Sequence, residues 1–285
     1  MTSTIRSSAL TLITLLCGLL AGTAGAQSEG VVRAPFVTTP PEVVARMLAL
    51  AGTGPGDTVY DLGSGDGRIP IAAARLHGAR GVGLELDPAL VEKSRAAATA
   101  AGVAERTEFR VEDVLAADLR PASVVTIYLL PSLMDRLSTR LLYEARPGTR
   151  IVTHAFAFPS WKPDKVETVK LPDSRYGRAD QSTVMLWVVP AQARGRYRAN
   201  DASGPWSFTI HQNFQEIELE ARLGSAPLRI DAARLSGAEI EWRGSVELEG
   251  RPVAVSFRGR VSTDRMLGEL QVGGQARPFA AQKLP

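Results

Sequence analysis

The stretch Val59-Tyr60-Asp61-Leu62-Gly63-Ser64-Gly65-Asp66-Gly67 decides the fold class of this 285-residue chain. Its apolar start predicts a strand. The three glycines at alternate positions predict a sharp turn that opens a helix, because glycine bends freely and leaves its N–H groups bare for a ligand. The dinucleotide spacing G-x-G-x-x-G is not met, since Gly67 comes one residue early. The stretch therefore predicts a strand–turn–helix unit whose main chain can lie against a ligand other than a dinucleotide.

The carboxylates of this turn indicate the kind of ligand. Asp61 and Asp66 would repel a pyrophosphate, whereas they would attract a cofactor that carries an ammonium and a sulfonium cation. S-adenosylmethionine is such a cofactor. We therefore expect it here, and the same two acids disfavour an NAD-dependent oxidoreductase.

Two further acids follow predicted strands. Residues 81–86 predict a second strand with Glu85 at its tip, where a carboxylate can accept hydrogen bonds from a ribose diol. Residues 107–111 predict a third strand, and Asp113 shortly after it can accept from an adenine amino group. The alternative interpretation is an ordinary tight connection at the glycines and a solvated helix cap at Asp113.

Strands and helices alternate through the first two thirds of the chain. We expect strands near 58–62, 81–86, 107–111, 123–129 and 150–156, with helices over 68–77, 88–101 and 132–145. Another helix is expected after Pro40-Pro41, with Thr39 as its N-cap. This alternation predicts a parallel sheet with helices on both faces. Residues 166–171 and 182–189 have no helix between them and predict an antiparallel hairpin.

The pattern changes in residues 195–285, where short alternating apolar runs are separated by glycines. It predicts an all-β domain, an antiparallel meander of roughly six to eight strands that forms a small sandwich or open barrel. Charges at alternate positions, as in Glu216, Glu218 and Glu220, predict one wet sheet face. We interpret it as an accessory domain, and the alternative is a glycan-binding or substrate-presenting module.

The N-terminus has the features of a secretory signal peptide. Arg6 precedes an apolar run over 9–20, and Ala24-Gly25-Ala26 fits a cleavage site. We expect residues 1–26 to be removed and the rest to be periplasmic or secreted. The alternative is an uncleaved membrane anchor, which would leave the same part outside.

The composition of the remaining chain argues against thiol chemistry, nucleic-acid binding and a metal centre. Cleavage would remove the only cysteine, Cys17, and with it any disulfide or thiolate chemistry. It would also lower the formal net charge from +3 to +2, which gives no basis for nucleic-acid binding. His77, His154 and His211 lie far apart without ligand spacing, so we expect no metal.

The quoted stretch, Glu85 and Asp113 resemble the class I (seven-stranded) S-adenosylmethionine-dependent methyltransferases. Residues 34–40 (APFVTTP), 61–74 (DLGSGDGRIPIAAA), 128–131 (YLLP) and 161–164 (WKPD) make the chain similar to one group. This group is the lysine methyltransferases of the ATP-synthase c-subunit and adenine-nucleotide-translocase type, with their bacterial relatives. The resemblance covers 32–190 and implies a seven-stranded Rossmann-like sheet and N-methylation of a protein lysine. The chain departs from the pattern with Phe36 in place of Tyr, and with Ala155 and Ala157 where acids are common.

On these grounds the cofactor site is expected to contain nine residues: Thr39, Asp61, Gly63, Ser64, Gly65, Asp66, Gly67, Glu85 and Asp113. We expect two catalytic residues. Tyr128 ends an uncharged strand and can hold an amine with its hydroxyl or ring face, although it can equally be a core aromatic. His154 can accept a proton or contact the substrate, and the alternative is a structural histidine.

One alternative to catalysis arises from the expected compartment. S-adenosylmethionine is made in the cytoplasm, so an exported protein meets little of it. The second hypothesis is therefore an exported, non-catalytic ligand-binding protein on a methyltransferase scaffold. Ala155 and Ala157 keep this hypothesis open, while the complete set of cofactor-side acids and glycines argues against it.

Overall fold

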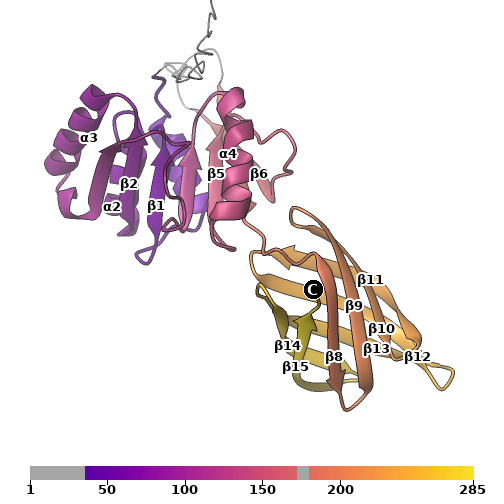
Figure 1. The fold of residues 1–285 in the computed structure, drawn as a ribbon. Coiled ribbons are helices and arrows are strands. Elements are labelled where there is room, and N and C mark those ends of the chain that lie inside the picture. The colour runs from indigo at the N-terminus through magenta and orange to yellow at the C-terminus, as the bar shows by residue number, and fades with distance from the viewer. Residues whose placement is uncertain (1–35, 172–179) are drawn as a thin grey trace, which may run out of the picture. The chain divides into compact units, whose positions relative to one another are not determined.

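The computed structural model describes residues 36–171 and 180–285. The expected signal peptide, residues 1–26, lies outside these ranges. Within the described ranges no helix is long and apolar enough to cross a membrane. Figure 1 shows two architectures along the chain, a sheet flanked by helices and then a β-barrel. The expected fold class, a methyltransferase sheet followed by an all-β domain, is confirmed.

The first architecture is a seven-stranded mixed sheet with the strand order β3-β2-β1-β4-β5-β7-β6. Its strands are β1 (Thr58–Leu62), β2 (Arg80–Glu85), β3 (Thr107–Val111), β4 (Val124–Ile127), β5 (Arg150–His154), β6 (Lys165–Lys170) and β7 (Gln181–Val188). The first five are parallel, and β7 pairs antiparallel with both β5 and β6, as the predicted hairpin requires. The order reverses between β1 and β4. Ligands of open α/β sheets bind outside the carboxyl ends of the strands at this switch point.

Helices cover both faces of this sheet: α1 (Pro41–Leu50), α2 (Arg68–His77), α3 (Pro88–Ala100) and α4 (Pro131–Glu144). Successive strand residues point to opposite faces. Val59 accordingly packs in the cluster that contains α1 and α2, whereas Tyr60 packs in the cluster that contains α4. Both residues are buried, so β1 is a central strand that reaches the site without solvent on either face.

The expected cap of the first helix is wrong. Pro40, not Thr39, occupies the N-cap position, and no side chain makes a capping hydrogen bond there. Proline at the first helical position presets the helical φ, so α1 starts at Pro41 and Thr39 lies one residue too early to cap it. The Thr39 hydroxyl lies instead 3.3 Å from His154 Nδ1.

The second architecture is a closed antiparallel barrel of eight strands. They are β8 (Gly195–Asp201), β9 (Gly204–Asn213), β10 (Glu216–Leu223), β11 (Ala226–Ser236), β12 (Glu239–Leu248), β13 (Arg251–Val261), β14 (Arg265–Val272) and β15 (Gln275–Lys283). The all-β meander is confirmed, but it is neither a sandwich nor open, because β15 pairs with β8. Closure removes both sheet edges.

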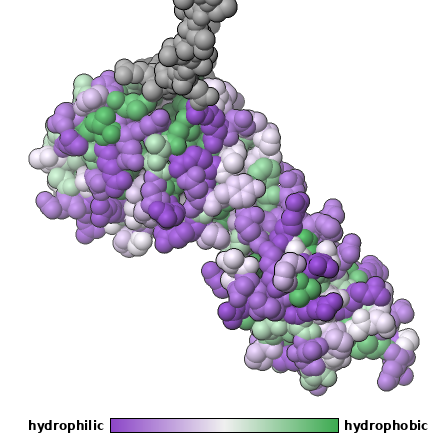
Figure 2. All heavy atoms as spheres, viewed as in Figure 1, coloured by the Kyte–Doolittle hydropathy of each residue, from purple (hydrophilic) through white to green (hydrophobic). Residues whose placement is uncertain are grey.

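Aromatic side chains fill the barrel. Trp206, Phe208, Trp242, Phe257 and Phe279 form a continuous set of ring contacts with centroids 5.8–6.0 Å apart. The expected charged positions are exposed. Figure 2 shows mainly hydrophilic side chains on the face in view. The interior is thus a packed core, and the outer face is the solvated side of the sheet.

Candidate functional site

The turn after β1 has a backbone that only glycine adopts easily. Gly63, Gly65 and Gly67 have φ of 78°, 54° and 77°. A Cβ on Gly63 would lie 2.7 Å from the Leu129 side chain, and one on Gly65 would lie 2.5 Å from the Phe36 ring. The turn therefore lies against the end of β4 and the segment before α1. Its N–H groups at residues 63, 64, 65 and 67 are not bare as expected, because they donate to the Leu84 carbonyl, the Glu85 carboxylate and the Ser64 carbonyl.

Glu85 fixes this turn to the tip of β2. Its Oε2 accepts from Gly65 N at 3.0 Å, and its Oε1 accepts from the N–H groups of Leu86 and Asp87 at 2.8 and 3.0 Å. The carboxylate is thus held at the carboxyl end of the strand. Oε1 already accepts two hydrogen bonds, whereas Oε2 accepts one and has a second lone pair with which it can accept from a ligand hydroxyl group.

Asp113 follows β3, the neighbouring edge strand. Its Oδ1 accepts from Leu115 N at 2.9 Å, which is the geometry of a short side-chain-to-backbone turn. The other oxygen accepts no hydrogen bond from the described residues and is therefore suited to accept from a ligand. Glu85 and Asp113 thus stand at the ends of adjacent parallel strands.

Asp61 is a buried carboxyl group near the end of β1, just before the turn. It is 3% exposed and accepts from Thr126 Oγ1 of β4 at 2.7 Å. Burial raises its pKa to about 7, the negative charges of Glu85 and Asp66 add to the rise, and the Thr126 hydrogen bond opposes it. A buried carboxyl group with one neutral hydrogen-bond donor and no positively charged partner is suited to bind a cation.

Asp66 has its partner within the protein. Its two carboxylate oxygens accept from Arg68 Nε and Nη2 at 2.9 and 2.7 Å, and the guanidinium holds the pKa of Asp66 below its usual value. Arg68 Nη1 also donates to the Thr39 carbonyl at 2.8 Å. The ion pair therefore connects the glycine turn to the segment before α1, and it leaves Asp61 as the less compensated of the two acids.

Ser64 is the remaining member of the turn. Its hydroxyl is buried and has no hydrogen-bond partner among the described residues. A Cβ on Gly83 would lie 2.6 Å from it, so the side chain is directed down onto β2. Its backbone contributes more to the turn, because the Ser64 carbonyl accepts from Gly67 N at 2.9 Å.

An aromatic row lies at the ends of β4 and β5. Tyr128 follows β4, and its ring centroid is 4.1 Å from the ring of His154 and 6.2 Å from that of Phe156. The parallel register Ile127↔Thr153 places Tyr128 and His154 side by side. This row, Tyr128, His154 and Phe156, adjoins the glycine turn through Leu129, the next residue after Tyr128.

His154 is held as a neutral ring. Its Nδ1 contacts the Thr39 hydroxyl and its Nε2 contacts the Ser182 hydroxyl, so both ring nitrogens have partners. Burial lowers the pKa of His154 to about 4. A histidine with both nitrogens engaged and a low pKa is poorly suited to accept a proton, and this geometry favours the structural interpretation of His154.

The sequence interpretation missed three residues of this region. Thr126 is a polar residue within the apolar strand Val124–Ile127, and that pattern could have marked it as a partner for Asp61. Arg68 follows Asp66 by two residues, a spacing that could have suggested the ion pair. Phe156 carries no such signal, because its place beside Tyr128 depends on the turn that follows β5.

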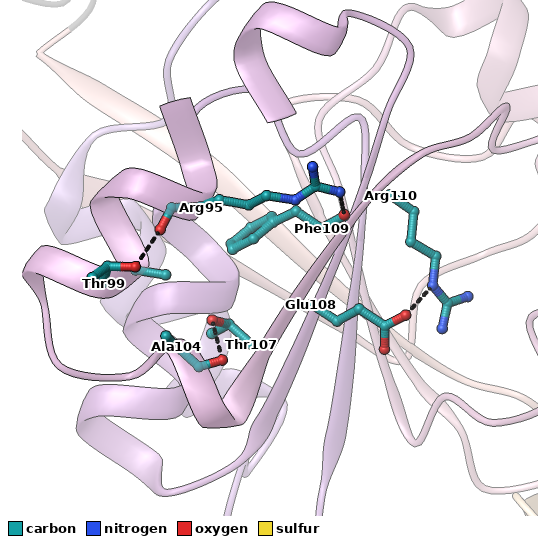
Figure 3. Close-up of a pocket in the computed structure, with 8 residues that line it drawn as sticks. Arg95, Thr99, Ala104, Thr107, Glu108, Phe109 and Arg110 are labelled. Atoms are coloured by element: carbon teal, nitrogen blue, oxygen red, sulfur yellow. Dashed lines mark hydrogen bonds and ion pairs between the residues drawn. The ribbon is translucent and has the colours of Figure 1, made fainter. Parts of the chain in front are cut away.

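A separate groove of about 590 Å3 lies between α3 and the edge strand β3 (Figure 3). Its polar groups are satisfied by one another: Arg95 donates to the Phe109 carbonyl at 2.7 Å, and Arg110 pairs with Glu108 at 2.6 Å. None of the candidate site residues lines it. Nor do the described residues contain a group of three or more metal-ligating side chains that could hold an ion. The functional site is therefore assigned to the carboxyl ends of the strands.

Comparison with known proteins finds relatives of the part of the chain that contains this site. The model of the ANTKMT methyltransferase domain matches residues 61–165. A protein-lysine N-methyltransferase of Saccharolobus islandicus is 36% identical over 156 residues, which are 54% of this chain and 93% of that protein. The ATP synthase c-subunit lysine N-methyltransferase of Xenopus laevis is 39% identical over 46% of this chain, and the match spans 56% of its own length.

A solved structure is also similar. It is an RNA methyltransferase from Salinibacter ruber in complex with S-adenosyl-L-homocysteine, 50% identical, with a TM-score of 0.49. The match covers 54% of this chain and 94% of that one. All of these matches are confined to about half of this chain or less, so they leave much of it unmatched.

Proposed function

Because the chain belongs to the ANTKMT methyltransferase-domain family and is thus an S-adenosylmethionine-dependent methyltransferase, we propose that it methylates the side-chain nitrogen of a protein lysine. The proposal of lysine as acceptor is supported by the names of the relatives from Saccharolobus and Xenopus. The geometry that carries it is the aromatic row at the ends of β4 and β5, which adjoins the glycine turn and contains no charged side chain at neutral pH.

The residues of the turn fit the cofactor. The Leu129 side chain and the Phe36 ring lie so close to Gly63 and Gly65 that a Cβ on either glycine would displace a side chain beside the turn. Glu85 and Asp113 present carboxylate oxygens at the tips of adjacent strands, where they would accept from the ribose and the adenine amino group. Asp61 would bind the cationic end of the cofactor, whose charge would stabilise the ionised carboxylate that burial disfavours. Bound S-adenosylmethionine supplies a methyl group on a sulfonium.

The acceptor side must provide an uncharged nitrogen. A lysine amine with a pKa near ~10.4 costs about 4–5 kcal/mol to deprotonate at pH 7, and apolar, partly desolvated surroundings lower this cost. Tyr128 and neutral His154 offer such surroundings, and the proton lost from the amine passes to solvent. The methyl group then forms a bond to nitrogen as its bond to sulfur breaks, so the protein has only to position the two reactants and manage charge.

The roles of the two expected catalytic residues follow from their contacts. We assign Tyr128 to contact the acceptor, because its hydroxyl makes no hydrogen bond with the described residues and its ring contacts both other members of the row. His154 fixes the Tyr128 ring at 4.1 Å and is itself held by Thr39 and Ser182. His154 is therefore a positioning residue. Among the described residues we assign none as a general base, and the amine proton is lost to solvent.

Labelled methyl transfer tests the proposed acceptor. The chain is incubated with cell-envelope extract and methyl-labelled S-adenosylmethionine, and the products are treated separately with protease and ribonuclease. We expect protease-sensitive label that appears as methyl-lysine after hydrolysis. Ribonuclease-sensitive label would overturn the lysine proposal and favour an RNA acceptor, while leaving the methyltransferase assignment intact.

Export is a separate proposal that rests on the N-terminal sequence alone. Arg6, the apolar run and Ala24-Gly25-Ala26 support cleavage after Ala26 and a periplasmic or secreted location. Mass spectrometry of the protein recovered from cells tests it. A mature N-terminus at Gln27 is expected, whereas an intact Met1 in the membrane fraction would support the anchor, and an intact Met1 in the cytosol would exclude export.

A further inference from the structure

The chain makes an unusual turn directly after β5. Ala155 has a φ of 64°, a region that side chains other than glycine rarely adopt. Phe156 N donates to the His154 carbonyl at 2.8 Å, so the three residues form a γ-turn with its central residue at positive φ. Two other non-glycine residues described here, Phe214 and Glu249, share this feature, and both lie in hairpin connections of the barrel.

Neighbouring hydrogen bonds hold this turn in place. Ala155 N donates to the Thr183 carbonyl of β7 at 2.8 Å, and the buried Thr153 hydroxyl donates to the Phe156 carbonyl at 2.6 Å. Strained backbone persists where the surrounding structure determines it in this way, and it is often found at functional sites. The consequence of this turn is the position of one side chain, that of Phe156.

The Phe156 ring stacks on Tyr128 and still faces solvent. The two rings are inclined by 17° with centroids 6.2 Å apart, and Phe156 is 37% exposed. A large aromatic residue held open to solvent by a strained turn does not serve the core. It lies at the carboxyl end of a central strand, next to the Tyr128 ring that also contacts neutral His154.

This part of the row also lacks charge. Ala155 and Ala157 flank Phe156 and are exposed, so no carboxylate projects from the turn itself. A ring face attracts an alkylammonium through its quadrupole, and an apolar wall does not hold the amine in its charged state as strongly as a carboxylate would. Such a wall suits a side chain that must bind as a cation and react as a neutral amine.

We propose that Phe156 is a substrate-contacting residue, whose ring and that of Tyr128 form the walls that hold the stem and onium head of an alkylamine acceptor. The inference rests on the proposed function, since it names the part of the same site that selects the acceptor. The strained turn at Ala155 sets the angle of the Phe156 ring. The recognised group is an alkylammonium, read by ring faces without a carboxylate.

A pair of bisubstrate compounds tests this without knowledge of the natural acceptor. Both are S-adenosylhomocysteine analogues in which nitrogen replaces sulfur and carries a four-carbon chain. The chain ends in trimethylammonium in one compound and in its neutral isostere, tert-butyl, in the other. Calorimetric titration of each, with S-adenosylhomocysteine as reference, isolates the contribution of the onium head. We expect the wild-type protein to prefer the cationic compound by roughly two- to fivefold.

Three variants of Phe156 separate the effect of its ring face from that of apolar bulk, and one variant of Ala155 tests the effect of the strained turn. Phe156→Ala and Phe156→Leu should both lose the preference for the cationic compound, because leucine restores apolar bulk but no ring face. Phe156→Trp should keep or increase it. All three should bind S-adenosylhomocysteine as the wild type does, which also shows that they are folded. Ala155→Gly should retain the turn with less strain and leave binding of both compounds within about twofold of wild type.

Two results would overturn the proposal. One is an unchanged cationic preference in Phe156→Ala and Phe156→Leu. The other is a wild-type protein that binds S-adenosylhomocysteine but does not distinguish the two compounds. A wild-type protein that fails to bind S-adenosylhomocysteine itself would instead refute the proposed function, so the two failures are distinguishable.

Discussion

Thr126 Oγ1 donates a 2.7 Å hydrogen bond to Asp61 Oδ1, and it is the one side-chain hydrogen bond that the buried carboxyl group accepts among the described residues. The two residues lie opposite each other on the adjacent central strands β1 and β4. One neutral donor does not compensate a buried charge, and Glu85 and Asp66 add repulsion. The carboxyl group is thus destabilising without a ligand and suited to a cationic one.

Asp61→Asn should therefore have opposite effects on stability and on binding. The folded-state pKa of Asp61 is raised, so its contribution to stability is full below the unfolded value of 3.8 and is lost as pH rises through about 7. At pH 8 the variant should unfold with a free energy roughly 1–3 kcal/mol higher than wild type. Denaturant unfolding measures this change. A variant less stable than wild type at pH 8 would contradict the role given to Asp61.

The same pKa predicts the pH dependence of cofactor binding. A cation at Asp61 needs the ionised carboxylate, which is a minor species at pH 6 and the major one at pH 8. The affinity for S-adenosylmethionine should rise roughly tenfold over this range. Titration calorimetry at both pH values measures it, with Asp61→Asn as the control whose weaker affinity should not change. A flat wild-type profile would remove Asp61 from the cation site.

Gly65→Ala should weaken cofactor binding more than Gly102→Ala does, because its Cβ would displace the Phe36 ring beside the turn. Gly65 and Gly102 both have positive φ, of 54° and 68°, so alanine costs each about 1 kcal/mol in backbone strain. A Cβ at Gly102 meets nothing within 4 Å, whereas one at Gly65 would meet the Phe36 ring at 2.5 Å. Gly102→Ala is thus the matched control. If folded Gly65→Ala and Gly102→Ala bound the cofactor with equal affinity, Gly65 would not contribute to the cofactor site.

Burial of neutral His154 should make part of the free energy of unfolding sensitive to acid. Its folded-state pKa is lowered from 6.5 to about 4, so its contribution is full above 6.5 and is lost as pH falls through this range. Asp61 titrates with the opposite sign, so the comparison must be between wild type and His154→Gln at each pH. The difference between the two proteins should change by roughly 2 kcal/mol from pH 7 to pH 5. A constant difference would mean that His154 is not buried in its neutral form.

The sequence predicted the sheet because periodicity is a local signal. The bounds of β1, α2 and β3 agree with the expected ones, and the glycine turn lies where its composition placed it. Helix capping failed at Thr39, since Pro40-Pro41 sets the helix start and the Thr39 hydroxyl has a partner 115 residues away in His154. That partner belongs to another strand, so no local pattern indicates it.

The features that escaped prediction depend on distant pairs. Barrel closure requires Tyr197 to pair with Lys283, and alternating runs of residues cannot show whether the first and last strands meet. Similarly, the aromatic row depends on the register between β4 and β5 and on the turn at Ala155. The sequence placed Tyr128 and His154 in the right region, but no local pattern indicated Phe156 as their neighbour.

The glycine turn, together with Asp61 and Glu85, is assigned to bind S-adenosylmethionine. The most direct measurement is calorimetric titration of S-adenosylmethionine and S-adenosylhomocysteine into the chain starting at Gln27, which contains every described residue, with Glu85→Ala beside it. We predict micromolar binding of both compounds, weakened in Glu85→Ala by roughly 1–3 kcal/mol, the cost of a lost charge-assisted hydrogen bond. No binding of either compound to the folded wild-type protein would contradict this assignment.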